Sequence, residues 1–279
     1  DNKAAIANVM TMLAIMQREN RPHGDIHVAF VPDEEIGLCG AKLLDLDKFK
    51  VDFAYTIDCC ALGAIVYETF NAASVTIKIE GVTAHPMSAK GVLVNPLLVG
   101  MNLMSRFDAL QTPEHTDGKD GYWWFTDCEA NAATCKLGMN IRDFDRVRYE
   151  ERKQFVLETV EAVKADYPRA KIEVKIVDVY NNIADSIGED RWPIDLLYQA
   201  ADQLNIKPNT IAMRGGTDGS ALSVKGLLTP NYFTGAHNFH SNAEFFTDSN
   251  ADRGSSLYNN NLLRVIDSIK YGSSVIALG

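Results

Sequence analysis

Three consecutive carboxylates, Asp33, Glu34 and Glu35, stand at the end of an apolar segment of this 279-residue sequence. A fourth, Asp58, ends another apolar segment, and His240 adds an imidazole far along the chain. Taken singly, each fits a turn or a solvated loop. Together, they are the ligand types that Zn²⁺ or a similar divalent cation takes. An adjacent carboxylate that is not a ligand can act as a general base on water at such a site.

The segments before these carboxylates are predicted to be strands that bring them together. Residues 25–32 and 52–58 are rich in β-branched and aromatic side chains, which favours strands. A helix over 3–19 and a short helix over 40–49 alternate with them. This order predicts an α/β fold with a mostly parallel sheet. Because the carboxyl ends of parallel strands line the ligand crevice, we expect the carboxylates to converge there.

The first helix is predicted from its apolar residues at helical spacing. These are Ile6, Val9, Met10 and Leu13, which should form the buried face.

The pattern changes over residues 72–182, which we predict to be an inserted α+β sandwich domain with one open sheet face. Alternating segments predict strands, and Asn95 before Pro96 predicts a capped helix start. The stretch 112–127 is polar and aromatic, and no strand is assigned to it. The predicted strands are 73–81, 132–142 and 171–180, and the predicted helices start at 96 and span 147–165.

After the insertion the α/β pattern returns, so residues 1–71 and 183–279 are predicted to form one catalytic domain. Its later elements are a helix over 193–204, a strand over 210–214, a helix starting near 218 and a strand within 229–235. A final helix is predicted from its apolar side, which carries Leu257, Leu262, Val265, Ile266 and Ile269.

Composition narrows the possible functions. A net charge of −10 argues against a broad nucleic-acid surface. No apolar run approaches the length of a membrane span. Five cysteines without a CxxC pair indicate reduced thiols, so we expect a cytoplasmic protein. The "RGGTDG" stretch at 214–219 lacks the spacing of a dinucleotide fingerprint or a P-loop, which excludes a phosphate cradle there.

Several motifs, in order, resemble the co-catalytic zinc peptidases of the aminoacylase/carboxypeptidase superfamily, and within it the tripeptide aminopeptidases of the peptidase T type. They are "DNKAAI", "PDEEIG", "YTID", "NAASVTIKIEGVTAHPMSAKG", "IRDFDR", "RGGTDGSALSVKGLLTPNYFTG" and "NFH". They run from residue 1 to about 246 and so cover nearly the whole chain.

The resemblance implies two divalent metal ions, expected to be zinc. Asp1 would bridge them, Glu35 and His240 would bind one, and Asp58 would bind the other. Glu34 would then be the general base, so that the adjacent glutamates divide the work between metal and water.

The resemblance also implies a tripeptide substrate and a homodimer formed by the inserted domains. His85 would reach across the dimer to stabilise the oxyanion at the scissile carbonyl. Arg142 and Arg214 would grip the substrate carboxylate, for which a guanidinium fork is suited. Asn238, Gly215 and Gly216 would line the same pocket.

Several residues depart from the family pattern. The family carries a His-x-Asp pair upstream of the bridging aspartate, and this sequence has no histidine before His23. The "HGD" at 23–25 follows Asp1 and is interpreted as a turn. We therefore expect a metal ligand and the first strands in an N-terminal segment outside this sequence. Cys59 and Cys60 replace small residues expected after the metal-binding aspartate, where they could bulk the site or bind a soft metal.

Two alternatives stay open. The chain could belong to another amidohydrolase of the superfamily, a dipeptidase or an acyl-amino-acid hydrolase. It could instead be an inactive peptide-binding or dimerising fragment.

Overall fold

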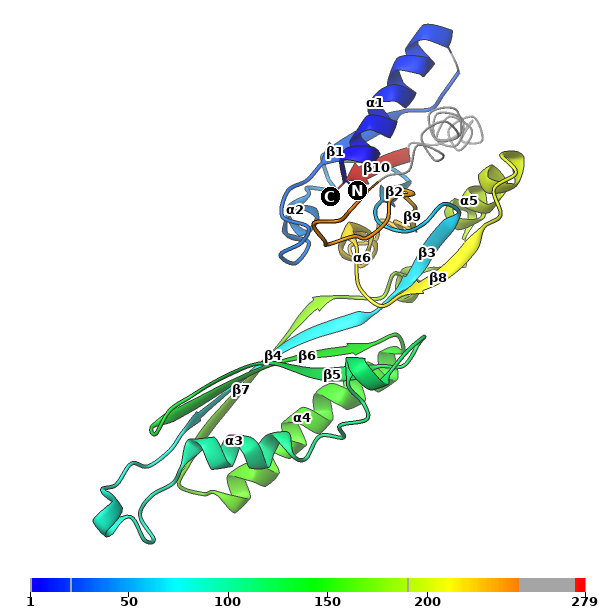
Figure 1. Ribbon diagram of the computed structural model, residues 1–279. Coiled ribbons are helices and arrows are strands. Elements are labelled where there is room, and N and C mark those ends of the chain that lie inside the picture. The colour runs from blue at the N-terminus through cyan, green and yellow to red at the C-terminus, as the bar shows by residue number, and fades with distance from the viewer. Residues whose placement is uncertain (1, 21, 190, 246–273, 279) are drawn as a thin grey trace. The chain divides into compact units, whose positions relative to one another are not determined.

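The computed structural model describes residues 2–20, 22–189, 191–245 and 274–278, in two compact units (Figure 1). Unit 1 comprises Asp1–Thr69 and Asn181–Gly279, and unit 2 comprises Phe70–Tyr180. The predicted division at 71/72 and 182/183 lies close to these bounds. The roles assigned to the two domains stay a prediction.

Unit 1 is built on a mixed sheet whose described strands follow the order β1-β10-β2-β9-β3-β8. Every neighbouring pair is parallel except β3 and β9, so the expected mostly parallel sheet is confirmed. The strands are β1 (Ile26–Phe30), β2 (Phe53–Ile57), β3 (Ala64–Thr69), β8 (Asn209–Met213), β9 (Asn231–Tyr232) and β10 (Ser274–Leu278). Strands β3 and β10 are not predicted from the sequence.

Helices complete unit 1. They are α1 (Asn2–Glu19), α2 (Cys39–Leu43), α5 (Trp192–Gln203) and α6 (Asp218–Ser223), with a 3-10 turn at Ile183–Ser186. The core joins β2 and β3 side chains to α1 and α5. Tyr55 is buried and donates a hydrogen bond to the Pro193 carbonyl oxygen at 2.6 Å, which ties β2 to the start of α5.

The buried face of α1 differs from the expected one. Ala5, Val9, Met12 and Met16 are the residues that enter the core, whereas Ile6 and Met10 are 39% and 55% exposed. The 5-9-12-16 spacing is as regular as the predicted one. Of the four residues predicted for this face, Val9 is buried and Leu13 packs against the core, so the prediction is wrong only for Ile6 and Met10.

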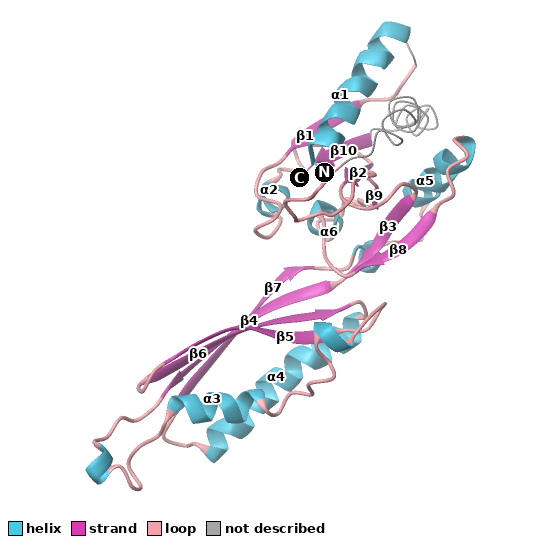
Figure 2. Cartoon of the chain, viewed as in Figure 1, coloured by secondary structure: helices cyan, strands magenta, loops and turns pink. Residues whose placement is uncertain are grey.

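Unit 2 is a four-stranded antiparallel sheet with helices on one face (Figure 2). The strand order is β5-β6-β4-β7, and helices α3 and α4 cover the sheet. The strands are β4 (Asn71–Glu80), β5 (Tyr122–Ala130), β6 (Thr134–Asp143) and β7 (Lys171–Tyr180). The helices are α3 (Pro96–Met104) and α4 (Arg146–Asp166), with 3-10 turns at Pro86–Ser88 and Pro113–His115.

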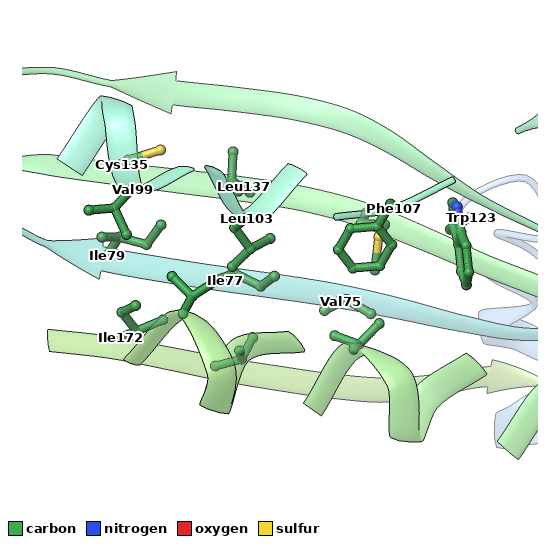
Figure 3. Close-up of a cluster of buried hydrophobic side chains, with 14 of the residues drawn as sticks. Val75, Ile77, Ile79, Val99, Leu103, Phe107, Trp123, Cys135, Leu137 and Ile172 are labelled. Atoms are coloured by element: carbon green, nitrogen blue, oxygen red, sulfur yellow. The ribbon is translucent and has the colours of Figure 1, made fainter. Parts of the chain in front are cut away.

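Alternation along β4 shows how the open sheet face arises. Val75, Ile77 and Ile79 are buried among side chains of the covering helices, as Figure 3 shows. Ser74 precedes these residues and Lys78 lies between Ile77 and Ile79, and both are exposed on the other face. Asn95 caps α3 as predicted, because its Oδ1 accepts a hydrogen bond from the Leu97 amide at 3.1 Å.

Strand β5 of unit 2 is not predicted from the sequence, which gives a connection there. Its second half is exposed on both faces, so the period-two signal of a half-buried strand fades there. The predicted final helix over 257–269 lies outside the described residues. Among the helices that are described, none combines the length and apolar character needed to cross a membrane.

Candidate functional site

Glu34 and Glu35 are presented by a tight turn that follows β1. The Glu34 carbonyl oxygen accepts hydrogen bonds from the Gly37 and Leu38 amides at 3.0 and 2.9 Å. Asp33 before them has a φ of 63°, a left-handed conformation that aspartate tolerates better than most residues. The turn leaves Glu34 half-buried and Glu35 exposed, so the two adjacent carboxylates face different environments.

Asp58 follows β2 and is held through its backbone. Its amide donates to the Tyr232 carbonyl oxygen at 3.2 Å, and its own carbonyl oxygen accepts from Asn231 Nδ2 at 2.8 Å. Both partners lie on β9, the parallel neighbour of β2. The sheet therefore fixes Asp58 at the carboxyl ends of its strands.

His240 approaches the first carboxylate turn. Its Nε2 lies 3.2 Å from Glu35 Oε2, although both side chains are largely exposed. The loop that carries His240 is closed by paired backbone hydrogen bonds between His237 and Phe245. The predicted ligand pair Glu35 and His240, more than 200 residues apart in sequence, thus meets in space.

Asp218, which the sequence analysis did not select, belongs to the same group of acids. It is 2% exposed at the start of α6, and neither carboxylate oxygen has a hydrogen-bond partner among the described residues. Thr217 caps the helix instead, in a capping box with Ser220. A lone aspartate in a glycine-rich turn carries no distinguishing sequence signal, and only the fold reveals its burial.

Burial raises the pKa of three of these acids, and neighbouring charges raise it further for Glu34 and Asp58. Burial, then the charges of Asp218 and Glu35, raise the pKa of Glu34 to about 7. Burial first, then Glu34 and other neighbours, raise the pKa of Asp58 to about 7. Burial raises the pKa of Asp218 to about 6. The carboxylates of Glu34, Glu35 and Asp58 therefore lie close enough for their charges to act on one another.

This concentration of negative charge fits a divalent cation. Buried carboxylates without hydrogen-bond partners are costly unless a positive charge compensates them. Oxygen donors plus imidazole suit zinc and related ions. Within the part of the chain that the structure describes, however, no three such side chains are grouped to hold one ion. The predicted bridging ligand, Asp1, lies outside the described residues.

The predicted substrate-binding residues of unit 1 lie in two loops. Arg214, Gly215 and Gly216 follow β8 and are half-buried. Asn238 has a φ of 57° and donates through Nδ2 to the Ala243 carbonyl oxygen at 3.2 Å, so it stabilises its own loop. Their contact with substrate stays a prediction.

His85 and Arg142 belong to unit 2. His85 is exposed, and its Nδ1 accepts the Met87 amide at 3.2 Å, which leaves Nε2 as the outer ring nitrogen. Arg142 donates from one terminal nitrogen to the carbonyl oxygens of Ala73 and Ile141, and its guanidinium stacks on Tyr180.

The two cysteines after Asp58 are in contact. Their sulfurs are 2.7 Å apart, and either thiol can donate the hydrogen bond that joins them. This hydrogen bond raises the pKa of Cys59 and lowers that of Cys60.

Comparison with known proteins finds peptidases by family model and by sequence similarity. The model of peptidase family M20/M25/M40 matches residues 1–264. A peptidase T-like protein of Yersinia pestis is 61% identical over 245 residues, which is 88% of this chain and 60% of that protein. Peptidase T of Escherichia fergusonii is 43% identical over 248 residues, with the same coverage of both chains.

A solved tripeptidase from Staphylococcus aureus superposes with a TM-score of 0.84 at 22% identity, over 97% of this chain and 71% of that one. At this identity the likeness establishes the fold. The chain spans 60% of the length of the curated relatives it matches.

Proposed function

The chain belongs to peptidase family M20/M25/M40, and on this basis we propose that it is part of a metal-dependent aminopeptidase that removes the N-terminal residue of tripeptides. The relatives named peptidase T support this substrate class. They also favour it over a dipeptidase or an acyl-amino-acid hydrolase. Because the chain spans only part of their length, the activity is that of the protein to which the chain belongs.

The observation that carries the proposal is the state of Glu34. Glu34 is half-buried beside the exposed Glu35, and burial with the neighbouring carboxylates raises its pKa. A carboxylate in this position can accept a proton from water. Its neighbour Glu35 is instead exposed and paired with His240. These different surroundings suit Glu34 to proton transfer and Glu35 to metal binding.

We assign Asp1, Glu35, Asp58 and His240 to the binding of two divalent ions, with zinc as the expected metal. When bound, such ions supply Lewis acidity and lower the pKa of water. Glu34 then accepts the proton of the attacking water and passes it to the leaving amine. Asp218 supports this role, since its buried charge helps to keep the pKa of Glu34 high.

The remaining predicted residues position the peptide. The residues of unit 1 that would recognise the substrate are Arg214, Asn238 and the backbone amides of Gly215 and Gly216. Arg142 would hold the substrate carboxylate, because its planar fork can bind both oxygens. His85 would donate from Nε2 to the oxyanion, acting on the neighbouring subunit of a homodimer. The reduced cysteines are consistent with a cytoplasmic location.

A substrate panel tests the proposal. Purified protein loaded with divalent metal should release the N-terminal residue from unblocked tripeptides, and a chelator should abolish this activity reversibly. N-acetylated tripeptides, dipeptides and N-acyl amino acids should react poorly. Hydrolysis of N-acyl amino acids alone would identify an acyl-amino-acid hydrolase and contradict the proposal.

A further inference from the structure

The Cys59–Cys60 pair is arranged for a reaction that peptide hydrolysis does not use. The two sulfurs are 2.7 Å apart, only about 0.7 Å longer than a disulfide bond of about 2.05 Å. Both residues are partly buried, so a small oxidant can still reach them. Little movement separates the two thiols from a covalent bond.

The backbone around the pair holds the thiols together. The Cys59 carbonyl oxygen accepts hydrogen bonds from the amide and hydroxyl of Thr234, at 2.7 and 3.1 Å. The Cys60 carbonyl oxygen accepts one from the Gly235 amide at 3.0 Å. Cys59 and Cys60 have φ values of 47° and 72°, a conformation that cysteine rarely adopts. The fold therefore maintains a turn that an unfolded chain would seldom visit.

We propose that Cys59 and Cys60 form a reversible oxidation site, which a two-electron oxidant such as hydrogen peroxide converts into a vicinal disulfide. The two thiols give up two protons and two electrons, and a bond forms between the sulfurs. The O–O bond of peroxide breaks, and two water molecules leave. A thiol reductant returns both sulfurs to the reduced form through a mixed disulfide.

Geometry makes this disulfide easy to reduce. Neighbouring Cα atoms across a trans peptide are about 3.8 Å apart. Ordinary disulfides span about 4.4–6.8 Å between Cα atoms. The resulting eight-membered ring is strained, and strained disulfides are the labile and regulatory ones. The site would respond to an oxidising pulse and recover afterwards.

The position of the pair links oxidation to the candidate active site. Asp58 directly precedes Cys59, and Asn231 holds the Asp58 carbonyl oxygen in the same turn. Closing the ring would redirect the Asp58 carboxylate and weaken metal binding. This consequence rests on the proposed function, whereas formation of the disulfide does not.

Disulfide mapping tests the proposal on the native protein. Trypsin cleavage after Lys50 and Lys78 gives one peptide, 51–78, which contains both cysteines and none of the other three. The reduced protein is treated with hydrogen peroxide, alkylated and digested. We expect peptide 51–78 to lose two hydrogens and take up no alkylating reagent. Dithiothreitol should restore both alkylation sites.

Two controls show that the folded turn is responsible. The disulfide should form at least tenfold faster in the native protein than in urea, where the turn is lost. Cys128→Ser should leave the reaction unchanged, because Cys128 lies on β5 in unit 2. Sulfinic acid at either residue without a disulfide, or equal rates in native and unfolded protein, would overturn the proposal.

Activity provides a separate readout. Peroxide should lower tripeptide hydrolysis severalfold in the wild type and much less in a Cys59→Ser/Cys60→Ser variant. If the disulfide forms and activity persists, the link to Asp58 is refuted. If the protein hydrolyses no peptide at all, the proposed function fails while the mapping result stands.

Discussion

Replacing Asp218 with asparagine should stabilise the metal-free protein above pH 6. Asp218 is 2% exposed, and within the described part of the chain both of its carboxylate oxygens lack hydrogen-bond partners, so its ionised form is poorly solvated in the fold. Asparagine has nearly the same shape and carries no charge. The Thr217 cap of α6 does not involve the Asp218 side chain and should survive the change.

The expected gain follows from the pKa of Asp218. Burial raises this pKa from 3.8 to about 6 in the folded protein. Each pKa unit corresponds to about 1.4 kcal/mol, so ionised Asp218 destabilises the fold by about 3 kcal/mol. A raised pKa stabilises the fold fully below the unfolded value, and this stabilisation is lost as the pH rises through the folded value. The advantage of the variant should therefore be near zero at pH 3.5, grow between pH 4 and 6 and level off above.

Urea denaturation in the presence of a chelator, at several pH values between 3.5 and 8, measures this difference. Asp195→Asn is a matched control, since Asp195 also occupies the first turn of a helix but is about half exposed. Its effect should stay within about 1 kcal/mol at every pH. An Asp218→Asn variant that is less stable than the wild type at pH 8, or whose effect does not vary with pH, would refute the reasoning.

Three further substitutions test individual residues. Glu34→Gln should lower kcat for tripeptide hydrolysis about 10²- to 10⁴-fold. Elemental analysis should find the metal content unchanged. Metal loss would mean that Glu34, and not Glu35, is the metal ligand. His85→Ala should lower kcat about 10²-fold or more with metal retained, and unchanged turnover would disprove its oxyanion role. Asp143→Asn should destabilise unit 2 by about 3 kcal/mol in urea denaturation. The reason is that the fully buried Asp143 carboxylate pairs with Arg148 and Arg152 at 3.1 and 2.9 Å. A loss of stability below about 1 kcal/mol would contradict this prediction.

Part of the candidate site was predictable because parallel strands end at a common edge. Asp33, Glu34 and Glu35 follow β1 and Asp58 follows β2, so strand prediction alone placed them together. Strand prediction could not show that His240 approaches Glu35. This approach depends on the loop closed between His237 and Phe245, and only the family resemblance pointed to it.

Other features required the three-dimensional structure. Asp218 looks like an ordinary turn residue in sequence, and its importance arises from burial. The contact between the Cys59 and Cys60 sulfurs depends on two left-handed residues, which local sequence does not favour for cysteine. Strand β5 was missed because its second half is exposed, so pairing with β6 rather than hydrophobic alternation defines it.

The number of metal ions bound per chain tests the central claim most directly. Protein of verified intact mass is equilibrated with micromolar zinc, freed of excess metal and analysed for its elements. The account predicts about two ions per chain in the wild type and a lower value in Asp58→Ala. A folded protein that binds no zinc under these conditions would contradict the assignment of a two-metal peptidase.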